Sequence, residues 1–161
     1  MYHHVLVGTD GSLTASRAVE AAARLAHAHR ARLTIAHAFP PVGARRRTAS
    51  PVPEEFSWLQ TPGGAADALV VRAVEVAQQA ACGALTIDGR AEVGHPRGVL
   101  RALVDELRPD AVVVGNADAR RSLTRRGLGT WLAGRTHADV VIVDTSGDTS
   151  AGIGGSESEA A

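Results

Sequence analysis

The fold of this chain is decided by one segment, residues 111–130, which reads AVVVGNADARRSLTRRGLGT. The segment opens with an apolar run that stops at Gly115, and a second apolar run follows at residues 140–143. Short β-branched runs that end at glycine are typical of strands buried on both faces of a parallel sheet. Ligands bind at the carboxyl ends of such strands, and glycines beside a helix start at Thr130 suit an anion. The segment therefore predicts a nucleotide phosphate site.

The same alternation of strands and helices extends toward both ends of the chain. Apolar runs predict strands at residues 5–7, 33–39, 111–114 and 140–143, and a weaker strand at 85–87 that runs on toward Val93. Helical spacing predicts helices over 13–30, 65–82, 97–107 and 130–137. Strands that alternate with helices in this way predict an α/β fold, with a parallel sheet covered by helices on both faces.

Two segments break the alternation. Residues 40–64 hold five of the seven prolines and a run of three arginines, and a loop this long is typical of a lid, a binding loop or a flexible insert. A solvated, flexible insert is the simplest interpretation. Residues 147–161 are rich in Gly, Ser, Ala and Glu, which predicts a disordered tail. We therefore expect one domain over residues 1–146, followed by the tail at 147–161.

Composition narrows the function classes. The formal net charge of the 161 residues is zero, which argues against nucleic-acid and membrane-surface partners. Cys82 is the single cysteine, so neither an internal disulfide nor a cysteine metal cluster can form. A reducing cytoplasm is the expected location, because no signal-peptide pattern or bilayer-length apolar run occurs.

The seven histidines do not have the spacing of a metal site. His3 and His4 are expected at a frayed chain start, and His27 and His29 point to different faces of a helix. His37 is interpreted as a packed core histidine. No metal ligand set is predicted from these residues.

Three motifs in the right order resemble one family, the universal stress proteins. Residues 7–12, VGTDGS, resemble the opening strand and its D-G-S turn, and residues 93–96, VGHP, resemble the G-x-P turn halfway along the family's sequence. Residues 112–143 resemble the last glycine loop with its short helix and terminal strand. The resemblance covers residues 3–145 without the 40–64 insert. It implies a Rossmann-like sandwich around a five-stranded parallel sheet, similar to the adenine nucleotide alpha hydrolases.

The resemblance also implies a nucleotide motif, G-x2-G-x9-G-[ST], in the members that bind ATP. Gly115 supplies the first glycine, but Asp118 occupies the second position and Leu128 the third. Gly129 and Thr130 restore the final pair only if the loop contains one extra residue. The phosphate loop is therefore degraded in this protein.

The charged residues of the degraded loop have opposing effects on phosphate binding. The carboxylate of Asp118 would repel phosphates, or it would help to hold Mg²⁺ beside them. Arginine is well suited to bidentate phosphate contacts, and four candidates lie in the loop: Arg120, Arg121, Arg125 and Arg126. By resemblance, the nucleotide-binding residues are Asp10, Ala38, Gly115, Gly129 and Thr130.

Three functions remain open. The first is an ATP-binding regulatory or signalling protein of the stress response, with at most slow hydrolysis and with Mg²⁺ accompanying the nucleotide. The second is a member that binds no nucleotide and acts as an interaction module, a homodimer paired through Val140–Val143, because an apolar sheet edge invites a partner strand. The third, a nucleotidyl transferase or adenylating enzyme, is disfavoured because the chain contains no lysine for a phosphate loop.

Overall fold

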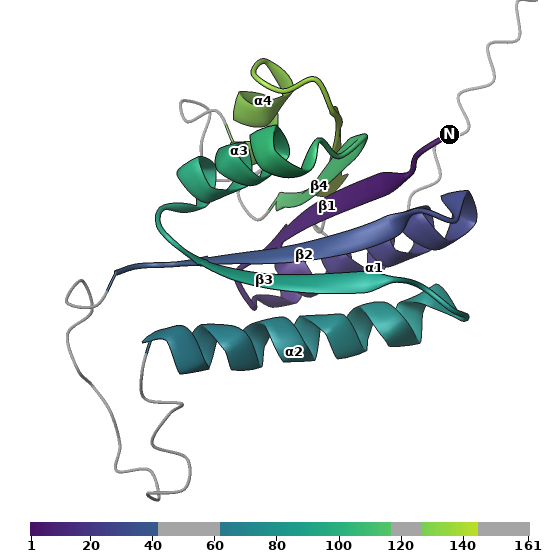
Figure 1. Cartoon of the computed structure of the whole chain (residues 1–161), viewed down its shortest axis with the longest axis horizontal. Helices are drawn as coiled ribbons and strands as arrows, with labels where there is room; N and C mark the ends of the chain where they lie inside the picture. Colours follow the sequence, from purple (N-terminus) through teal and green to yellow (C-terminus); the bar gives the residue numbers. More distant parts are fainter. Residues whose placement is uncertain (42–61, 117–126, 145–161) are drawn as a thin grey trace, which may run out of the picture.

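The computed structural model describes residues 1–41, 62–116 and 127–144 (Figure 1). Within these ranges strands and helices alternate, as the sequence predicts. The elements in chain order are β1 (His4–Thr9), α1 (Leu13–His29), β2 (Arg32–Phe39), α2 (Pro62–Ala81), β3 (Ile87–Val93), α3 (Pro96–Leu107), β4 (Ala111–Asn116), α4 (Leu128–Ala133) and β5 (Asp139–Asp144).

The strands form one five-stranded parallel sheet in the order β3-β2-β1-β4-β5, which confirms the predicted fold class. The chain builds outward from β1 through β2 to β3, then returns to the other side of β1 and continues through β4 to β5. The strand order therefore reverses between β1 and β4. In sheets of this type the carboxyl ends of the strands beside such a reversal form a natural crevice.

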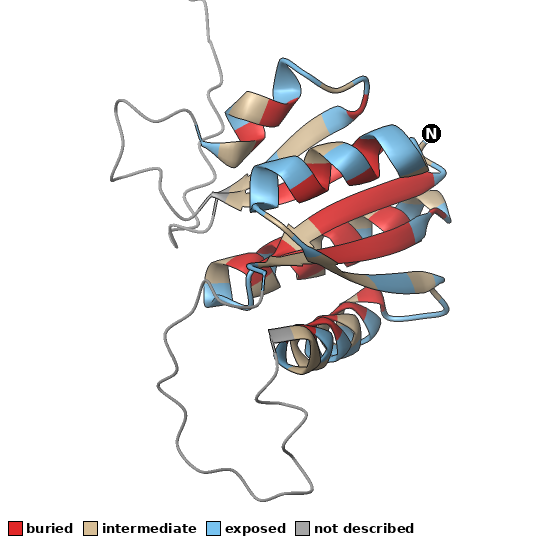
Figure 2. Ribbon diagram, turned by 60° about the vertical axis from the view of Figure 1, so that its left-hand side comes forward, coloured by how far each residue is buried: buried red, intermediate tan, exposed pale blue. Residues whose placement is uncertain are grey.

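Helices cover both faces of the sheet (Figure 1). One core lies under α1 and α2 and takes Val5, Val7 and Val113 from the strands. The other lies under α3 and α4 and takes Leu6, Val112 and Val114. Successive strand residues point to opposite faces, so the unbroken apolar runs supply both cores at once. Figure 2 shows the buried residues concentrated in the central strands and on the inward sides of the helices.

Local signals explain where two helices begin. The Oγ of Ser12 accepts a hydrogen bond from the N–H of Ala15 at 3.1 Å, so Ser12 is the N-cap of α1. Helix α2 begins at Pro62, which lies inside the segment predicted to be an insert. Proline fits the first turn of a helix because its missing N–H has no partner there.

Other predictions of local structure were wrong. The last helix covers Leu128–Ala133 and not residues 130–137, so Thr130 lies inside this helix and not at its start. His4 is not at a frayed start but is 5% exposed in β1.

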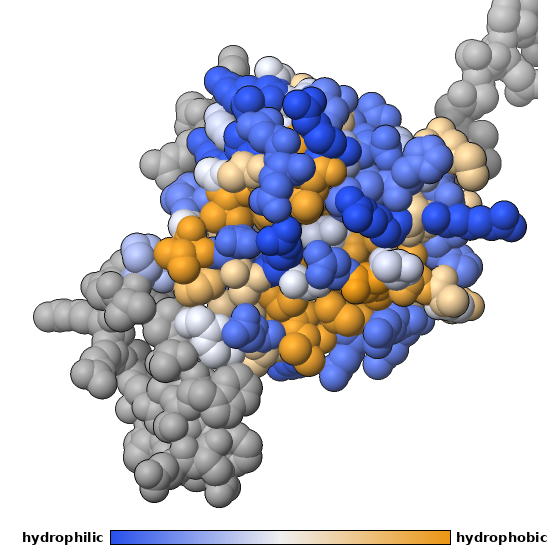
Figure 3. All heavy atoms as spheres, in the orientation of Figure 1, coloured by the Kyte–Doolittle hydropathy of each residue, from blue (hydrophilic) through white to orange (hydrophobic). Residues whose placement is uncertain are grey.

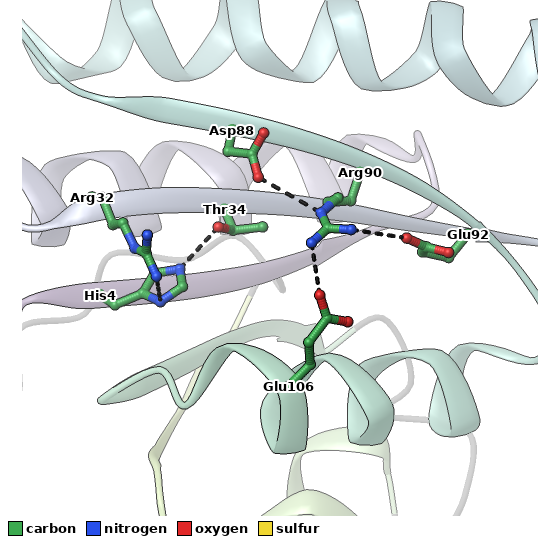
Figure 4. Close-up of polar contacts among 7 residues, drawn as sticks. All are labelled: His4, Arg32, Thr34, Asp88, Arg90, Glu92 and Glu106. Atoms are coloured by element: carbon green, nitrogen blue, oxygen red, sulfur yellow. Dashed lines mark hydrogen bonds and ion pairs between the residues drawn. The ribbon is translucent and has the colours of Figure 1, made fainter.

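Polar contacts explain why His4 is buried. Its Nε2 lies 2.9 Å from the Oγ1 of Thr34, and an Nη of Arg32 lies 3.2 Å from its Nδ1 (Figure 4). The backbone N–H groups of His3 and His4 both donate to one carboxylate oxygen of Asp110. Both ring nitrogens and the main chain therefore have partners, which removes most of the penalty for burying a polar group.

The edge strand β3 carries a charged cluster. Figure 4 shows the guanidinium of Arg90 pointing toward three carboxylates, those of Asp88 and Glu92 on the same strand and of Glu106 on α3. The contact with Glu106 is the shortest, at 2.9 Å. Charged side chains on an edge strand hinder its pairing with another chain.

Within the ranges that the structure describes, no helix combines the length and the apolar character needed to cross a bilayer. Over the same residues no group of three or more His, Cys, Asp and Glu side chains is placed to hold a metal ion.

Candidate nucleotide site

A hollow of about 250 Å³ opens at the carboxyl ends of the central strands. Its floor comes from Gly8 of β1, Ala36 and Ala38 of β2, and Val114 and Gly115 of β4. These strands flank the point where the strand order reverses, which is the usual ligand position in an open α/β sheet. We call this hollow the strand-end pocket.

The turn between β1 and α1 forms one wall of the strand-end pocket. The carboxylate of Asp10 accepts the N–H of Ser12 at 3.0 Å, and the Oγ1 of Thr9 accepts the N–H of Gly11 at 3.2 Å. Gly11 has a φ of +79°, a backbone conformation that side chains with a Cβ rarely adopt. The turn is therefore fixed by two side-chain hydrogen bonds and one glycine.

Helix α3 forms the opposite, apolar wall. Gly94 donates its N–H to the carbonyl of Phe39 at 2.8 Å, which ties the end of β3 to the end of β2. Pro96 then begins α3, and the buried residues Val99 and Leu100 face the pocket. A Cβ on Gly8 would lie 3.0 Å from a methyl group of Leu100. Glycine at the end of β1 therefore lets α3 pack closely over the strand.

A second close approach lies on the other side of the pocket. A Cβ on Gly115 would lie 3.1 Å from the carbonyl oxygen of Thr14 and 3.2 Å from its Cγ2. The lack of a side chain at Gly115 lets the end of β4 meet the first turn of α1. Thr14 and Ala15 of that turn line the pocket, and Leu128 of α4 closes its far side.

Asp10 supplies the negative charge of the described lining. Partial burial would raise the pKa of its carboxyl, but hydrogen bonds from the hydroxyl and the N–H of Ser12 outweigh that effect and lower the pKa. The nearby His37 acts in the same direction. The Nδ1 of His37 lies 2.8 Å from the carbonyl oxygen of Thr9 and must donate in this hydrogen bond, because a carbonyl oxygen only accepts. Asp10 is thus held as a carboxylate at neutral pH.

The predicted site residues separate into three groups. Asp10, Ala38 and Gly115 line the strand-end pocket. Gly129 is buried in α4, where a Cβ would lie 2.6 Å from the side chain of Ile142, and Thr130 of the same helix is exposed. Neither residue is among the described residues that line the strand-end pocket. The loop positions lie outside the described residues, so their contacts stay predictions: Asp118, Arg120, Arg121, Arg125 and Arg126.

Other lining residues were missed by the sequence argument. Thr9 and Thr14 carry hydroxyl groups at the pocket. A search beside the end of the strand predicted at residues 5–7 would have found Thr9, whereas Thr14 lies in the first turn of α1. Val99 and Leu100 belong to the helix predicted over residues 97–107, but no ligand contact was predicted for them. Nothing in their helical spacing indicates that this helix extends past the sheet edge to a ligand.

Comparison with known proteins decides the family. A model of the universal stress protein family matches residues 1–151. The chain belongs to this family. The universal stress protein Rv1636 of Mycobacterium tuberculosis is 37% identical over 148 residues, which cover 90% of this chain and 98% of the relative.

Solved structures of other universal stress proteins share the fold. A universal stress protein crystallised in complex with cAMP is 35% identical, with a TM-score of 0.70, and the match covers 90% of this chain and 99% of that one. The crystal structure of Rv1636 is 31% identical, with a TM-score of 0.54 and coverage of 90% and 97%. A family member from Archaeoglobus fulgidus, 18% identical with a TM-score of 0.63, shows the fold alone; its match covers 88% of this chain and 98% of the other.

Proposed function

We propose that this universal stress protein binds an adenine nucleotide in the strand-end pocket and acts as a cytoplasmic regulatory protein of the stress response. The observation that carries the proposal is the position of the pocket, at the carboxyl ends of the strands where the strand order reverses. Its volume of about 250 Å³ lies just below the range typical of small-molecule sites, roughly 300–1,000 Å³.

The lining suits the two ends of a nucleoside. Ala36, Val99 and Leu100 offer small and branched apolar surfaces against which a flat base can pack. The carboxylate of Asp10 can accept hydrogen bonds from sugar hydroxyls, and the hydroxyl of Thr14 can donate to a phosphate oxygen. An apolar floor with a few polar groups at its margin is the general pattern of a cofactor site.

Charge favours a ligand with one phosphate. The described lining contains the carboxylate of Asp10 and no cation, so each added phosphate charge increases the repulsion. The relative crystallised with cAMP carries a ligand of this kind. We therefore favour cAMP or a mononucleotide over ATP. Binding of ATP would depend on Mg²⁺ and on Gly129, Thr130 and the loop arginines.

The proposed role is regulatory, with at most slow ATP hydrolysis. The chain contains no lysine to neutralise a leaving phosphate, and the described lining supplies hydroxyls and one carboxylate. The nucleotide would then change partner contacts and not be consumed.

A second copy of the chain is the proposed partner of β5. Val140–Val143 lie on an edge strand, and Ile142 is 45% exposed. Asp139 and Asp144 carry charge at the two ends of this strand, but the four residues between them are apolar, and such an apolar stretch of edge invites a partner strand. Ile142→Glu is expected to convert a dimer to a monomer in sedimentation velocity, while Val93→Glu, at the exposed end of the opposite edge strand, leaves it unchanged. A wild-type monomer at high concentration contradicts the proposed dimer.

Calorimetry with cAMP, AMP, ATP and ATP with Mg²⁺ tests the proposed ligand. We expect cAMP or AMP to bind more tightly than metal-free ATP, and Mg²⁺ to improve ATP binding. Tightest binding of metal-free ATP contradicts the charge argument. If none of the four binds to folded protein, the alternative function applies, a dimeric interaction module that binds no nucleotide.

A further inference from the structure

A second hollow, of about 460 Å³, lies between α1 and α2, on the face of the sheet away from α3. We call it the α1–α2 groove. Both helices pack on the same core, and their contacts leave this hollow beside the end of β1. It is larger than the strand-end pocket, although nothing in the nucleotide proposal uses it.

One continuous stripe of α2 forms a wall of the α1–α2 groove. The stripe follows the three- and four-residue spacing of a helix face. It consists of Ala65, Ala68, Leu69, Arg72, Ala73 and Val76. Val19 of α1 faces it across the groove. The groove is therefore lined mainly by aliphatic surface.

Helix α2 is also more apolar than a surface helix needs to be. It carries three charged residues, Asp67, Arg72 and Glu75, and Val71 is 57% exposed. Figure 3 shows apolar atoms gathered over α2 and the neighbouring strand β3 on the face in view. Helices that are apolar on most sides are usually covered. The composition of α2 thus favours a ligand along it.

The polar groups of the α1–α2 groove carry one charge. Arg72 is the cation of the described lining, and within the described ranges it forms no ion pair. No carboxylate is among the described lining residues. The Oγ1 of Thr9 accepts the N–H of Gly11, so its O–H remains able to donate to an anion.

We infer that the α1–α2 groove is a binding site for an amphipathic monoanion, a carboxylate on a linear acyl chain. The aliphatic walls would bury the acyl tail, and the guanidinium of Arg72 would receive the carboxylate. A divalent cation does not fit, because the described lining offers no carboxylate. A polyphosphate does not fit either, since one arginine and a hydroxyl cannot satisfy several phosphate groups.

The two hollows share one wall. Thr9 lines both of them, and a Cβ on Gly11 would lie 2.7 Å from a methyl group of Leu69 in the α1–α2 groove. The acyl site does not depend on nucleotide binding, however, because Thr9 is the one described residue that the two linings share. The two sites can therefore be tested separately.

Titration of the full chain with dodecanoate, below its micelle concentration, tests the inference. We expect saturable binding at one site per chain, and no binding of dodecyltrimethylammonium, whose head is cationic. Arg72→Gln is expected to weaken dodecanoate binding about tenfold, the usual value of a charge-assisted hydrogen bond. Arg101→Gln removes the same charge from α3 and should leave the affinity unchanged.

Two filling variants locate the ligand. Ala68→Trp should abolish dodecanoate binding, while Ala38→Trp, which fills the strand-end pocket, should leave it intact. Thermal unfolding shows whether each variant is folded; if Ala68→Trp is not, Ala65→Leu replaces it. Any of three results would overturn the inference. The first is that dodecanoate does not bind saturably, and the second is that dodecyltrimethylammonium binds equally well. The third is that Ala38→Trp abolishes dodecanoate binding while Ala68→Trp does not. Sedimentation with anionic vesicles but no binding of monomeric dodecanoate would overturn it in favour of a membrane surface.

Discussion

Replacing Gly11 by alanine tests the turn that separates the two hollows. Gly11 has a φ of +79°, and a non-glycine residue in that conformation costs about 1 kcal/mol. The added Cβ would lie 2.7 Å from a terminal methyl of Leu69, and turning that side chain off its rotamer costs about 0.5–1.5 kcal/mol more. We therefore expect Gly11→Ala to lower the free energy of unfolding by about 1.5–2.5 kcal/mol. The midpoint of thermal unfolding would fall by roughly 4–8 °C.

Gly98→Ala is the matched control. Gly98 lies inside α3, and a Cβ there would meet no atom within 4 Å. Alanine in a helix interior is more stable than glycine by about 0.5–1 kcal/mol, so this variant should be more stable than the wild type. Chemical denaturation would measure the change in unfolding free energy for Gly11→Ala and for Gly98→Ala, and scanning calorimetry would check both. A neutral or stabilising Gly11→Ala would refute the proposed strain at this turn.

Three further predictions concern stability. Burial, and then the guanidinium of Arg32, lower the pKa of His4. Neutral His4 therefore contributes fully to the free energy of unfolding at pH values above the pKa of an unfolded histidine, about 6.5. This contribution is lost as the pH falls from about 6.5 through the lower pKa of His4 in the folded state. His4→Gln should therefore flatten this part of the plot of unfolding free energy against pH. An unchanged plot would contradict the assignment of this pH dependence to His4. Ser12→Ala should cost about 1 kcal/mol by removing the N-cap of α1, whereas Ser16→Ala, inside the helix, should be nearly neutral; equal effects would refute the cap. Arg90→Gln should cost less than about 1 kcal/mol, because its three ion pairs are exposed, and a larger loss that persists in high salt would show a stronger network.

The fold followed from features that need no tertiary information. The runs at residues 5–7 and 111–114 are apolar without alternation, which already indicates strands buried on both faces. Each is followed by a turn and then by helical spacing, so the parallel order was predictable. Element ends were less certain: α2 begins at Pro62, because proline is favoured at a helix start as well as in loops.

Tertiary contacts explain what the sequence did not show. His4 resembles a residue at a polar chain end until Arg32 and Thr34 of the neighbouring strand are placed beside it. The strand-end pocket needs Leu100 of α3, whose approach to Gly8 depends on the packing of a helix over a strand far away in the sequence. Strand ends can be located from periodicity, whereas the second wall of a site requires the assembled layers.

Calorimetric titration of cAMP into the wild type and Ala38→Trp tests the central claim most directly. Ala38 is half-buried at the end of β2 and lines the strand-end pocket, so an indole there fills the hollow without entering the buried core. Ala28→Trp, exposed on α1, is the control for the substitution itself. We expect one cAMP site in the wild type and in Ala28→Trp, and none in folded Ala38→Trp. Undiminished binding in Ala38→Trp would place the nucleotide elsewhere and contradict the account.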